Sequence, residues 1–423
     1  MKQSKYNIYK YKKNGVFLIN TLSGVVMNIK NSSILDKLNK VKMNQKVEMD
    51  SDIKKLCELG ILVEEEENRE VNEIINHYRQ NELTITLFMT RQCNFRCVYC
   101  YEKFSDECMD KENLSSVLKF IQNYCLNHIV KKIRINLFGG EPLLNYSNII
   151  YFLNDLKSYC ECSDVLLSVG MTTNGYLLTK ERYECLYNLG LSDTQITLDG
   201  FQPVHDKKRC LRNSGKTFNR ITQNIDDICR LQKHSKILIR TNFDASSISS
   251  EKEFLAYLHN RYGDHIDLHF EAVKKWSKDY QKLVFNKKEE QDYTIELIRF
   301  CRENNIKNSY DSHLSYGRLS CVHALSNSFI IDSNMNVLKC TVDLENTNNV
   351  VGQLDDKGLI TFNENLKLWN TSFEECNDCA LLPICLKKRC PASIMQNKKK
   401  RCDYKENCQR YIDILDARYN AKR

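Results

Sequence analysis

The sequence predicts an α/β protein: an open, partial (β/α)6 TIM-like barrel, with a small α+β domain before it and a Cys-rich domain after it. From Leu83 to Val273, six apolar β-branched runs alternate with amphipathic segments, and eight Cys follow from Cys321 onward. Regular alternation of strands and helices is typical of a parallel sheet, and six units fall short of the eight of a closed barrel. The expected divisions are an N-terminal domain at 1–70, the barrel at 71–275, a bridging region at 276–315 and the Cys-rich domain at 316–423.

Composition restricts the class of protein. A chain of 423 residues is long for one core, and a net charge of +8 is modest at this length. The first 13 residues are polar and no run approaches the 18 to 20 apolar residues of a membrane span, so we expect a cytoplasmic protein without a membrane partner. Twenty Cys in such a chain indicate metal or redox chemistry rather than disulfides. The absence of an aromatic-interleaved basic patch argues against nucleic acid.

The N-terminal domain begins with three short strands separated by turn residues and continues with two helical patterns. The strands are expected at Tyr6–Tyr11, Val16–Asn20 and Val25–Ile29, and the helices at Ser33–Lys40 and Asp50–Leu59. The four consecutive glutamates Glu64–Glu67 predict a solvated hinge at its end.

The barrel is expected to contain six strands with helices between them. The predicted strands are Leu83–Thr90, Ile133–Phe138, Leu166–Thr172, Thr194–Leu198, Ile237–Thr241 and Ile266–Glu271. The predicted helices are Asn113–Leu126, Tyr146–Ser158, Thr179–Leu189, Phe218–Leu231 and Ser250–Arg261.

Unusual residues follow the carboxyl ends of these strands, where barrels place their chemistry. Cys93, Cys97 and Cys100 follow the first strand, in C-x3-C-x2-C spacing. Gly139-Gly140-Glu141 follows the second strand, Thr173-Asn174-Gly175 the third and Asp199-Gly200 the fourth, and Glu271 ends the sixth. Their placement at one rim predicts a site there.

The Cys triplet leaves one iron of a [4Fe–4S] cluster without a protein ligand, because such clusters normally take four Cys. Three clustered Cys alone also suit a zinc knuckle. The triplet, with Tyr99 before its third Cys and the Gly139-Gly140-Glu141 motif downstream, resembles the signature of the radical S-adenosylmethionine (SAM) superfamily. This resemblance implies an enzyme in which SAM binds the open iron and is cleaved reductively to a 5′-deoxyadenosyl radical.

The same resemblance implies a set of SAM contacts. Gly139, Gly140 and Glu141 would receive the methionine ammonium, Tyr99 and Val273 would contact the adenine, and Thr197 the ribose or carboxylate. Arg209, in the segment His205-Asp206-Lys207-Lys208-Arg209, would pair with the methionine carboxylate, and Asn174 joins the set at the third strand end. No residue is singled out as a catalytic acid or base.

The C-terminal Cys resemble the SPASM domain of radical SAM enzymes that modify peptides and proteins; a zinc ribbon would need a second CxxC pair. The resemblance implies two auxiliary [4Fe–4S] clusters, three clusters in all. The first would take Cys321, Cys340 and Cys390, with a possible open iron for a substrate thiolate. The second would take Cys376, Cys379, Cys385 and a last Cys, for which Cys408 is preferred and Cys402 is the alternative.

Two departures from the SPASM pattern leave every thiol in place. Four residues, not three, separate Cys385 from Cys390, and Met335 stands where Gly is usual. We expect Asn334 and Asn336 to supply that turn instead.

The N-terminal pattern resembles the RiPP recognition elements, which capture a leader peptide by strand addition. The predicted function is therefore the modification of a ribosomally made precursor peptide by a thioether or other carbon-centred cross-link, with a flavodoxin- or ferredoxin-type electron donor. The alternative is an anaerobic sulfatase-maturating enzyme, which forms formylglycine. That family has an Asp directly after the second Cys of the first auxiliary cluster, and here Thr341 follows Cys340, with Asp343 further on. A non-catalytic redox or peptide-binding protein is a third reading, disfavoured by the intact motifs.

Overall fold

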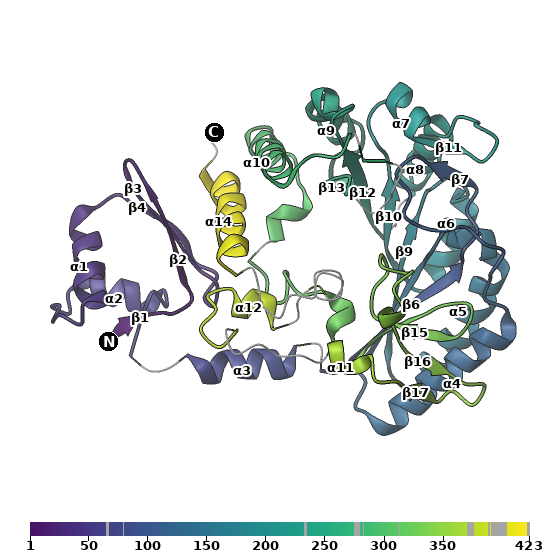
Figure 1. Ribbon diagram of the computed structural model, residues 1–423, viewed down its shortest axis with the longest axis horizontal. Coiled ribbons are helices and arrows are strands. Elements are labelled where there is room, and N and C mark those ends of the chain that lie inside the picture. Colours follow the sequence, from purple (N-terminus) through teal and green to yellow (C-terminus); the bar gives the residue numbers. More distant parts are fainter. Residues whose placement is uncertain are drawn as a thin grey trace. The chain divides into compact units, whose positions relative to one another are not determined.

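The computed structural model describes residues 1–64, 67–78, 80–231, 235–274, 280–281, 283–312, 314–369, 376–387, 390 and 404–420. The chain forms two compact units (Figure 1). Unit 1 comprises residues 1–80, 310–324 and 371–423, and unit 2 comprises residues 81–309 and 325–370. The two ends of the chain therefore belong to one unit, and the bounds of the four predicted domains stay predictions.

Six parallel strands form the centre of unit 2, each paired with the next in chain order. They are β6 (Glu82–Thr90), β8 (Lys132–Gly139), β9 (Leu166–Thr173), β10 (Leu191–Thr197), β12 (Lys236–Phe243) and β13 (Ile266–Ala272). Each of them overlaps one of the six predicted strands, and the α/β fold class is confirmed.

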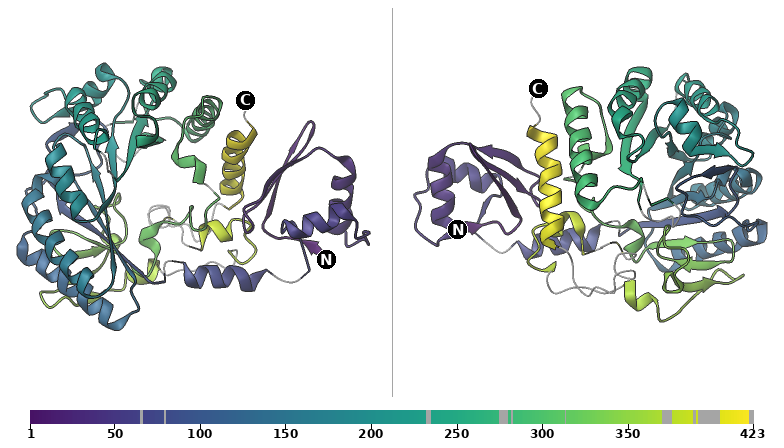
Figure 2. Two further views of the ribbon diagram at one scale, coloured as in Figure 1. Left: turned by 180° about the vertical axis from the view of Figure 1, so that it is seen from behind. Right: turned by 45° about the horizontal axis from the view of Figure 1, so that its top comes forward.

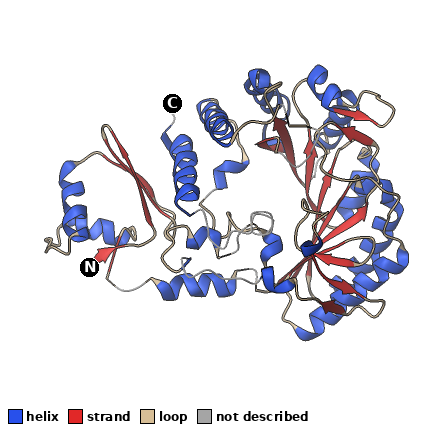
Figure 3. Ribbon diagram, viewed as in Figure 1, coloured by secondary structure: helices blue, strands red, loops and turns tan. Residues whose placement is uncertain are grey.

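Every crossover between these strands carries at least one helix. The helices are α4 (Lys111–Asn127), η1 (Pro142–Asn145), α5 (Tyr146–Cys162), α6 (Lys180–Asn188), α7 (Gln202–Lys208), α8 (Phe218–Cys229), α9 (Ile248–Tyr262) and η2 (Gly263–His265). Right-handed crossovers between adjacent strands place all helices on one face, as in a barrel (Figure 3). The carboxyl ends of the six strands therefore meet at one edge.

A short antiparallel pair not predicted from the sequence closes part of that edge. Strand β7 (Phe95–Cys97) pairs with β11 (Arg209–Leu211), so that Cys97 stands opposite Arg209. The pair fastens the loop after β6 to the segment after α7.

Four strands near the C-terminus extend the same sheet beyond β6. β14 (Ser328–Ile331) pairs in parallel with β6, and β15 (Asn336–Leu338), β16 (Val350–Leu354) and β17 (Ile360–Phe362) continue it antiparallel. Contrary to expectation, Met335 itself takes the left-handed conformation of the turn before β15, with φ +61°. The Asp332 side chain holds this turn by accepting the amides of Asn334 and Asn336, at 3.0 and 2.9 Å. The remaining elements of unit 2 are α10 (Lys287–Glu303), η5 (Thr347–Asn349) and α11 (Leu366–Trp369); η4 (Val322–Ala324) and all but the first residue of η3 (Ser309–Ser312) belong to unit 1.

Unit 1 contains a three-stranded antiparallel sheet in the order β2-β3-β4. Its strands are β2 (Asn7–Lys12), β3 (Gly15–Asn20) and β4 (Val26–Ile29), close to the three predicted runs. The other elements are β1 (Lys2–Gln3), α1 (Ser32–Lys42), α2 (Ser51–Glu58), β5 (Leu62–Val63), α3 (Asn68–His77), α12 (Leu382–Cys385) and α14 (Tyr404–Asn420).

Helices cover both faces of this small sheet, as two views show (Figures 1 and 2). On one face, Leu18 packs in a core with Leu38 and Ile53 of α1 and α2. On the other, Phe17 and Ile19 pack with apolar residues of α12 and α14: Leu381, Ile384, Tyr411, Ile412 and Leu415. The N-terminal sheet therefore shares a core with the C-terminal Cys-rich segment. In the part of the chain that the structure describes, no helix has the length and apolar character needed to cross a membrane.

Candidate active site

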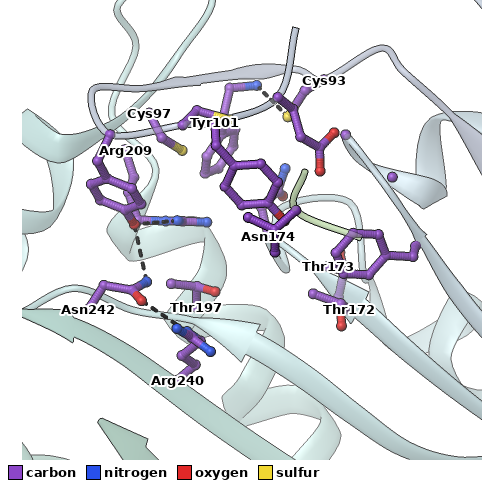
Figure 4. A pocket seen from close by; sticks show the side chains of 18 of the residues that line it. Cys93, Cys97, Tyr101, Thr172, Thr173, Asn174, Thr197, Arg209, Arg240 and Asn242 are labelled. Carbon is purple, nitrogen blue, oxygen red and sulfur yellow. Dashed lines mark hydrogen bonds between the residues drawn. The ribbon is translucent and has the colours of Figure 1, made fainter. Parts of the chain in front are cut away.

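The loop after β6 carries Cys93, Cys97 and Cys100 to the carboxyl edge of the sheet. All three residues line one cavity of about 370 Å³ (Figure 4). The Phe95 amide donates to the Cys93 sulfur at 3.4 Å, and the Cys100 amide donates to the Cys97 carbonyl at 3.1 Å. Backbone contacts thus hold the three thiols around a common space.

These thiols suit an iron–sulfur cluster, in which each Cys binds a different iron. Over the described ranges, no three His, Cys, Asp or Glu side chains converge closely enough to hold a single metal ion. Burial raises the pKa of Cys93 and of Cys100 to about 12. Positive charge from bound iron would hold such buried groups as thiolates.

The Gly139-Gly140 turn lies directly against the cluster loop. The Gly140 amide donates to the Thr90 carbonyl at 3.0 Å, and a Cβ on Gly140 would stand 2.2 Å from the Gln92 carbonyl oxygen. Gly139 has φ +114°, and a Cβ there would meet the Thr90 oxygen at 2.3 Å. Only glycine permits this approach, which explains the residue type at both positions.

The Glu141 carboxylate is held inside the protein by hydrogen bonds to the end of β9 and to the start of η1. It accepts hydrogen bonds from the Thr173 hydroxyl and the Asn174 amide, both at 2.8 Å, and from the Leu143 amide at 3.0 Å. Its side chain is fully buried and does not belong to the residues described around the cavity. Glu141 thus fixes the Gly139-Gly140 turn to the end of β9, and its contact with SAM stays a prediction.

A buried polar network centres on the Tyr99 hydroxyl. It donates to Asp199 and accepts from Arg209 at 2.7 Å and from the Asn242 side chain at 3.3 Å. Asp199 also accepts the Asn242 amide at 2.8 Å, and its own amide donates to His205 at 3.1 Å. The network joins the cluster loop to the ends of β10 and β12. Sequence reasoning placed Asp199 at the rim and missed Asn242.

One hydrogen-bond donor of Arg209 is unsatisfied in this network. Its Nε atom is buried and has no hydrogen-bond partner in the described part of the chain. Burial alone would lower the pKa of Arg209, but Cys97, Tyr99 and Asp199 raise it well above its ordinary value, so it stays charged. A buried charged donor without an acceptor is costly, and an anionic ligand in the cavity would satisfy it.

The cavity brings together most of the predicted site residues. Besides the three Cys, it is lined by Tyr99, Gly139, Gly140, Asn174, Thr197, Arg209 and Val273. The thiols, the close-packed glycines and the orphaned Arg209 donor together fit a cluster and a SAM molecule.

Other lining residues were not predicted, among them Tyr101, Glu102, Phe138, Thr172, Gln195, Arg240, Lys274, Thr341 and Val342. Two of them could have been predicted, because side chains two positions apart on a strand point to the same face. Gln195 lies two positions before Thr197 on β10, and Arg240 lies two positions before Asn242 on β12. Arg240 donates to Asn242 at 2.9 Å. Lys274 bridges Glu271 at 2.9 Å and Glu290 at 2.5 Å.

Cys340 directly precedes two residues that line the same cavity, Thr341 and Val342. The amides of Val342 and Asp343 each approach the Cys340 sulfur at 3.4 Å. Such N–H donors are a lever by which proteins tune cluster thiolates. The other two predicted ligands of this cluster, Cys321 and Cys390, belong to unit 1, so that ligand set stays a prediction.

A second group of thiols lies in unit 1. Cys379 interacts electrostatically with Cys376, Cys385 and Cys408, and burial is the main reason that its pKa is raised to about 12. The Cys379 amide donates to the Cys376 carbonyl at 3.3 Å. These are the four residues preferred for the second auxiliary cluster; the alternative, Cys402, lies outside the described residues.

Comparison with known proteins identifies the central region. Residues 87–241 match the radical SAM superfamily. Curated relatives include the GTP 3′,8-cyclase of Campylobacter jejuni, 29% identical over 236 residues that cover 53% of this chain and 68% of that protein. The GTP 3′,8-cyclase of Lactiplantibacillus plantarum is 27% identical over 271 residues, which cover 61% of this chain and 76% of that protein.

Two solved structures share the fold at low identity. The structure of anSMEcpe with bound AdoMet and Kp18Cys peptide has a TM-score of 0.62 and 16% identity, covering 80% of this chain and 97% of that one. Streptococcus suis SuiB has a TM-score of 0.50 and 14% identity, covering 96% of this chain and 98% of that one. At these identities the similarity establishes the fold alone.

Proposed function

We propose that this chain, whose residues 87–241 match the radical SAM superfamily, a family that binds SAM and a [4Fe–4S] cluster, modifies a ribosomally made precursor peptide. The modification is a thioether or another carbon-centred cross-link. The chemistry supplied by bound SAM is abstraction of a substrate hydrogen atom. The protein's part is to hold these groups and exclude water: Cys93, Cys97 and Cys100 hold the cluster, and the residues that line the cavity hold SAM.

The observation that carries the peptide proposal is the N-terminal sheet. Helices cover both of its faces, so only its edges can receive an extended peptide. The Asn20 amide donates to the Val25 carbonyl, which makes alternate residues of β4 face β3. Val26 and Asn28 therefore direct their backbone groups outward, and no backbone hydrogen bond is described for these groups in unit 1. We assign the leader peptide to this edge.

The auxiliary clusters are part of the same proposal. Cys376, Cys379, Cys385 and Cys408 would hold one, and Cys321, Cys340 and Cys390 the other. Loss of a hydrogen atom followed by bond formation leaves one electron on the substrate, and the clusters would accept it. A cluster at Cys340 would lie beside the cavity, because the next two residues line it.

A formylglycine-forming activity is the alternative. It requires a base where Thr341 and Asp343 follow Cys340. Thr341 lines the cavity, whereas Asp343 is not among the described lining residues and instead accepts a hydrogen bond from the Asn346 side chain at 3.0 Å. This arrangement favours peptide cross-linking over the sulfatase-maturating alternative.

The test is anaerobic incubation of the reconstituted enzyme with SAM, a reductant and a short Cys-rich peptide encoded beside its gene. The product should lose two hydrogens per cross-link, with fewer thiols open to alkylation. A two-hydrogen loss with every thiol still reactive would replace the thioether by a carbon–carbon or carbon–oxygen link. Cyclisation of GTP without any change in the peptide would refute the peptide proposal and favour the activity named for the curated relatives.

A further inference from the structure

The cationic side chains that line the cavity differ in what neutralises them. Arg209 lies in the buried polar network, and Lys274 forms ion pairs with Glu271 at 2.9 Å and with Glu290 at 2.5 Å. Arg240 also lines the cavity, but it forms no ion pair within the described part of the chain. Its positive charge is therefore open to a ligand.

Arg240 lies farther from the cluster loop than Arg209 does. It stands on β12, where its Cα pairs with that of Thr197 on β10. Figure 4 shows Arg209 beside Cys97, near the thiols. In the same view, Arg240 lies on the far side of Thr197 and Asn242 from the thiols. The two arginines therefore serve different parts of the cavity.

Asn242 fixes the orientation of the Arg240 guanidinium. The side-chain nitrogen of Asn242 donates to Tyr99 at 3.3 Å and to Asp199 at 3.2 Å, and its side-chain oxygen accepts the Nε of Arg240 at 2.9 Å. Over the residues that the structure describes, the two terminal nitrogens of Arg240 have no hydrogen-bond partner. These nitrogens form a planar fork that matches the two oxygens of a carboxylate.

The acidic residues near Arg240 do not occupy this fork. Glu271 is bound by Lys274 and lies beyond ion-pair distance of Arg240. Burial would raise the pKa of Glu271, but Lys274 and Arg240 hold it below its ordinary value, so that Glu271 stays ionised. Glu102, which lines the cavity, forms no ion pair with Arg240 either. A guanidinium without a counter-ion in a cleft attracts an anion.

We propose that Arg240 determines substrate specificity by binding a carboxylate of the precursor peptide inside the cavity. The carboxylate belongs to an Asp or Glu side chain or to the C-terminus of the peptide. SAM carries a single carboxylate, for which Arg209 is the predicted partner, so the fork of Arg240 is left for the substrate. The identity of this ligand rests on the proposed function, whereas the carboxylate site itself does not.

Chemical protection of Arg240 tests the site without turnover. Phenylglyoxal modifies arginine side chains, and peptide mapping by mass spectrometry gives the rate at each arginine of the anaerobic, SAM-loaded holoenzyme. N-acetylaspartate methylamide should half-protect Arg240 at a concentration about tenfold lower than N-acetylasparagine methylamide does, because only the first offers a carboxylate to the fork. Arg230, an exposed arginine that follows α8, is the internal control and should react equally with either probe present.

Further probes identify the source of the carboxylate. N-acetylalanine offers a C-terminal carboxylate, and whichever of it and N-acetylaspartate methylamide protects Arg240 at the lower concentration names the source. Equal protection by the aspartate and asparagine probes would overturn the proposal. Protection of Arg240 by SAM alone would assign the residue to SAM and overturn it as well. Protection by GTP at a lower concentration than by either carboxylate would replace the carboxylate with a phosphate ligand.

Turnover of the precursor peptide gives a second test, in a double-mutant cycle with Arg240→Gln. Glutamine keeps a donor for Asn242 and lacks the charged fork. Converting the recognised carboxylate of the peptide to an amide should lower kcat/KM about tenfold with the wild type and with the control Arg230→Gln, but less than about twofold with Arg240→Gln. Equal losses with all three enzymes would overturn the proposal. A precursor that stays unmodified while carboxylates still protect Arg240 would refute the proposed function and leave the carboxylate site standing.

Discussion

Arg209 donates a 2.7 Å hydrogen bond to the hydroxyl of Tyr99, which lies 110 residues earlier in the chain. The bond joins the segment after α7 to the cluster loop, beside the strand pair that sets Arg209 opposite Cys97. Among the residues that the structure describes, the buried Nε of Arg209 finds no acceptor. The residue thus has a structural role and, as we infer, an unfilled ligand-binding role.

Arg209→Lys should weaken SAM binding while keeping the positive charge. Lysine lacks the planar fork that serves Tyr99 and a ligand together, and losing a charge-assisted hydrogen bond costs about 1.5–3 kcal/mol. We expect Kd for SAM to rise roughly 10- to 100-fold in equilibrium dialysis of the reconstituted enzyme. The matched control, Arg230→Lys, should bind SAM normally. Wild-type affinity in Arg209→Lys would show that SAM does not use this donor.

The two described groups of Cys should each account for one cluster. Replacing Cys93, Cys97 and Cys100 with Ala should remove about four irons per chain and abolish 5′-deoxyadenosine formation. Replacing Cys376, Cys379, Cys385 and Cys408 should remove about four others and leave the SAM-dependent spectroscopic signal of the first cluster. Iron and zinc analysis with electron paramagnetic resonance checks both. Zinc in place of iron at the second group would contradict the auxiliary-cluster proposal.

Periodicity predicted the barrel because its strands are buried and bounded by turns. All six strands appear within a few residues of their expected bounds, and the triplet, Gly139 and Thr197 fall at one edge because parallel strands share a direction. The strand pairings between distant parts of the chain have no comparable signal in the sequence. β7 and β11 are three residues each, too short for a period, and β14 joins β6 from more than 200 residues away.

The packing of the N-terminal sheet against the C-terminal helices in unit 1 could not be predicted from the sequence either. Successive side chains of β3 point alternately into two cores, so the sequence of this strand is continuously apolar. Such a sequence does not reveal which elements cover each face of the sheet. Phe17 and Ile19 pack against α14, and Lys10 pairs with Asp413 of that helix at 2.7 Å. An isolated fragment of residues 1–70 would expose this apolar face, so leader binding is better tested in the full chain.

Asn28→Pro should impair leader binding at the edge of β4. Proline removes the outward N–H and is tolerated on edge strands, so the sheet should persist while one backbone hydrogen bond to the peptide is lost. We expect at least a tenfold weaker Kd for a fluorescent leader peptide, and unchanged SAM cleavage without peptide. Tyr11→Pro makes the matching change on the other edge strand, where Tyr11 also faces outward. A loss with Tyr11→Pro alone would move the leader to β2.

Glu251 should make stability depend on pH. Its carboxyl is buried and accepts a hydrogen bond from the Thr241 hydroxyl, while its other oxygen has no partner in the described chain. Burial raises the pKa of Glu251 from 4.5 to about 7. Between these values the folded protein keeps a proton that the unfolded chain has released, so stability must fall as pH rises.

Glu251→Gln replaces the protonated acid with a neutral amide that retains the acceptor for Thr241. In the wild type, protonated Glu251 contributes roughly 3 kcal/mol to the free energy of unfolding below pH 4.5, and this contribution should be lost as pH rises through about 7. The free energy of unfolding of the variant should not show this decrease. Thermal midpoints of the anaerobic holoenzymes at pH 5.5 and 8.0 give the comparison. The variant should gain on the wild type by a few degrees at the higher pH. Parallel pH profiles for the two proteins would contradict this prediction and would mean that Glu251 is ionised throughout this range.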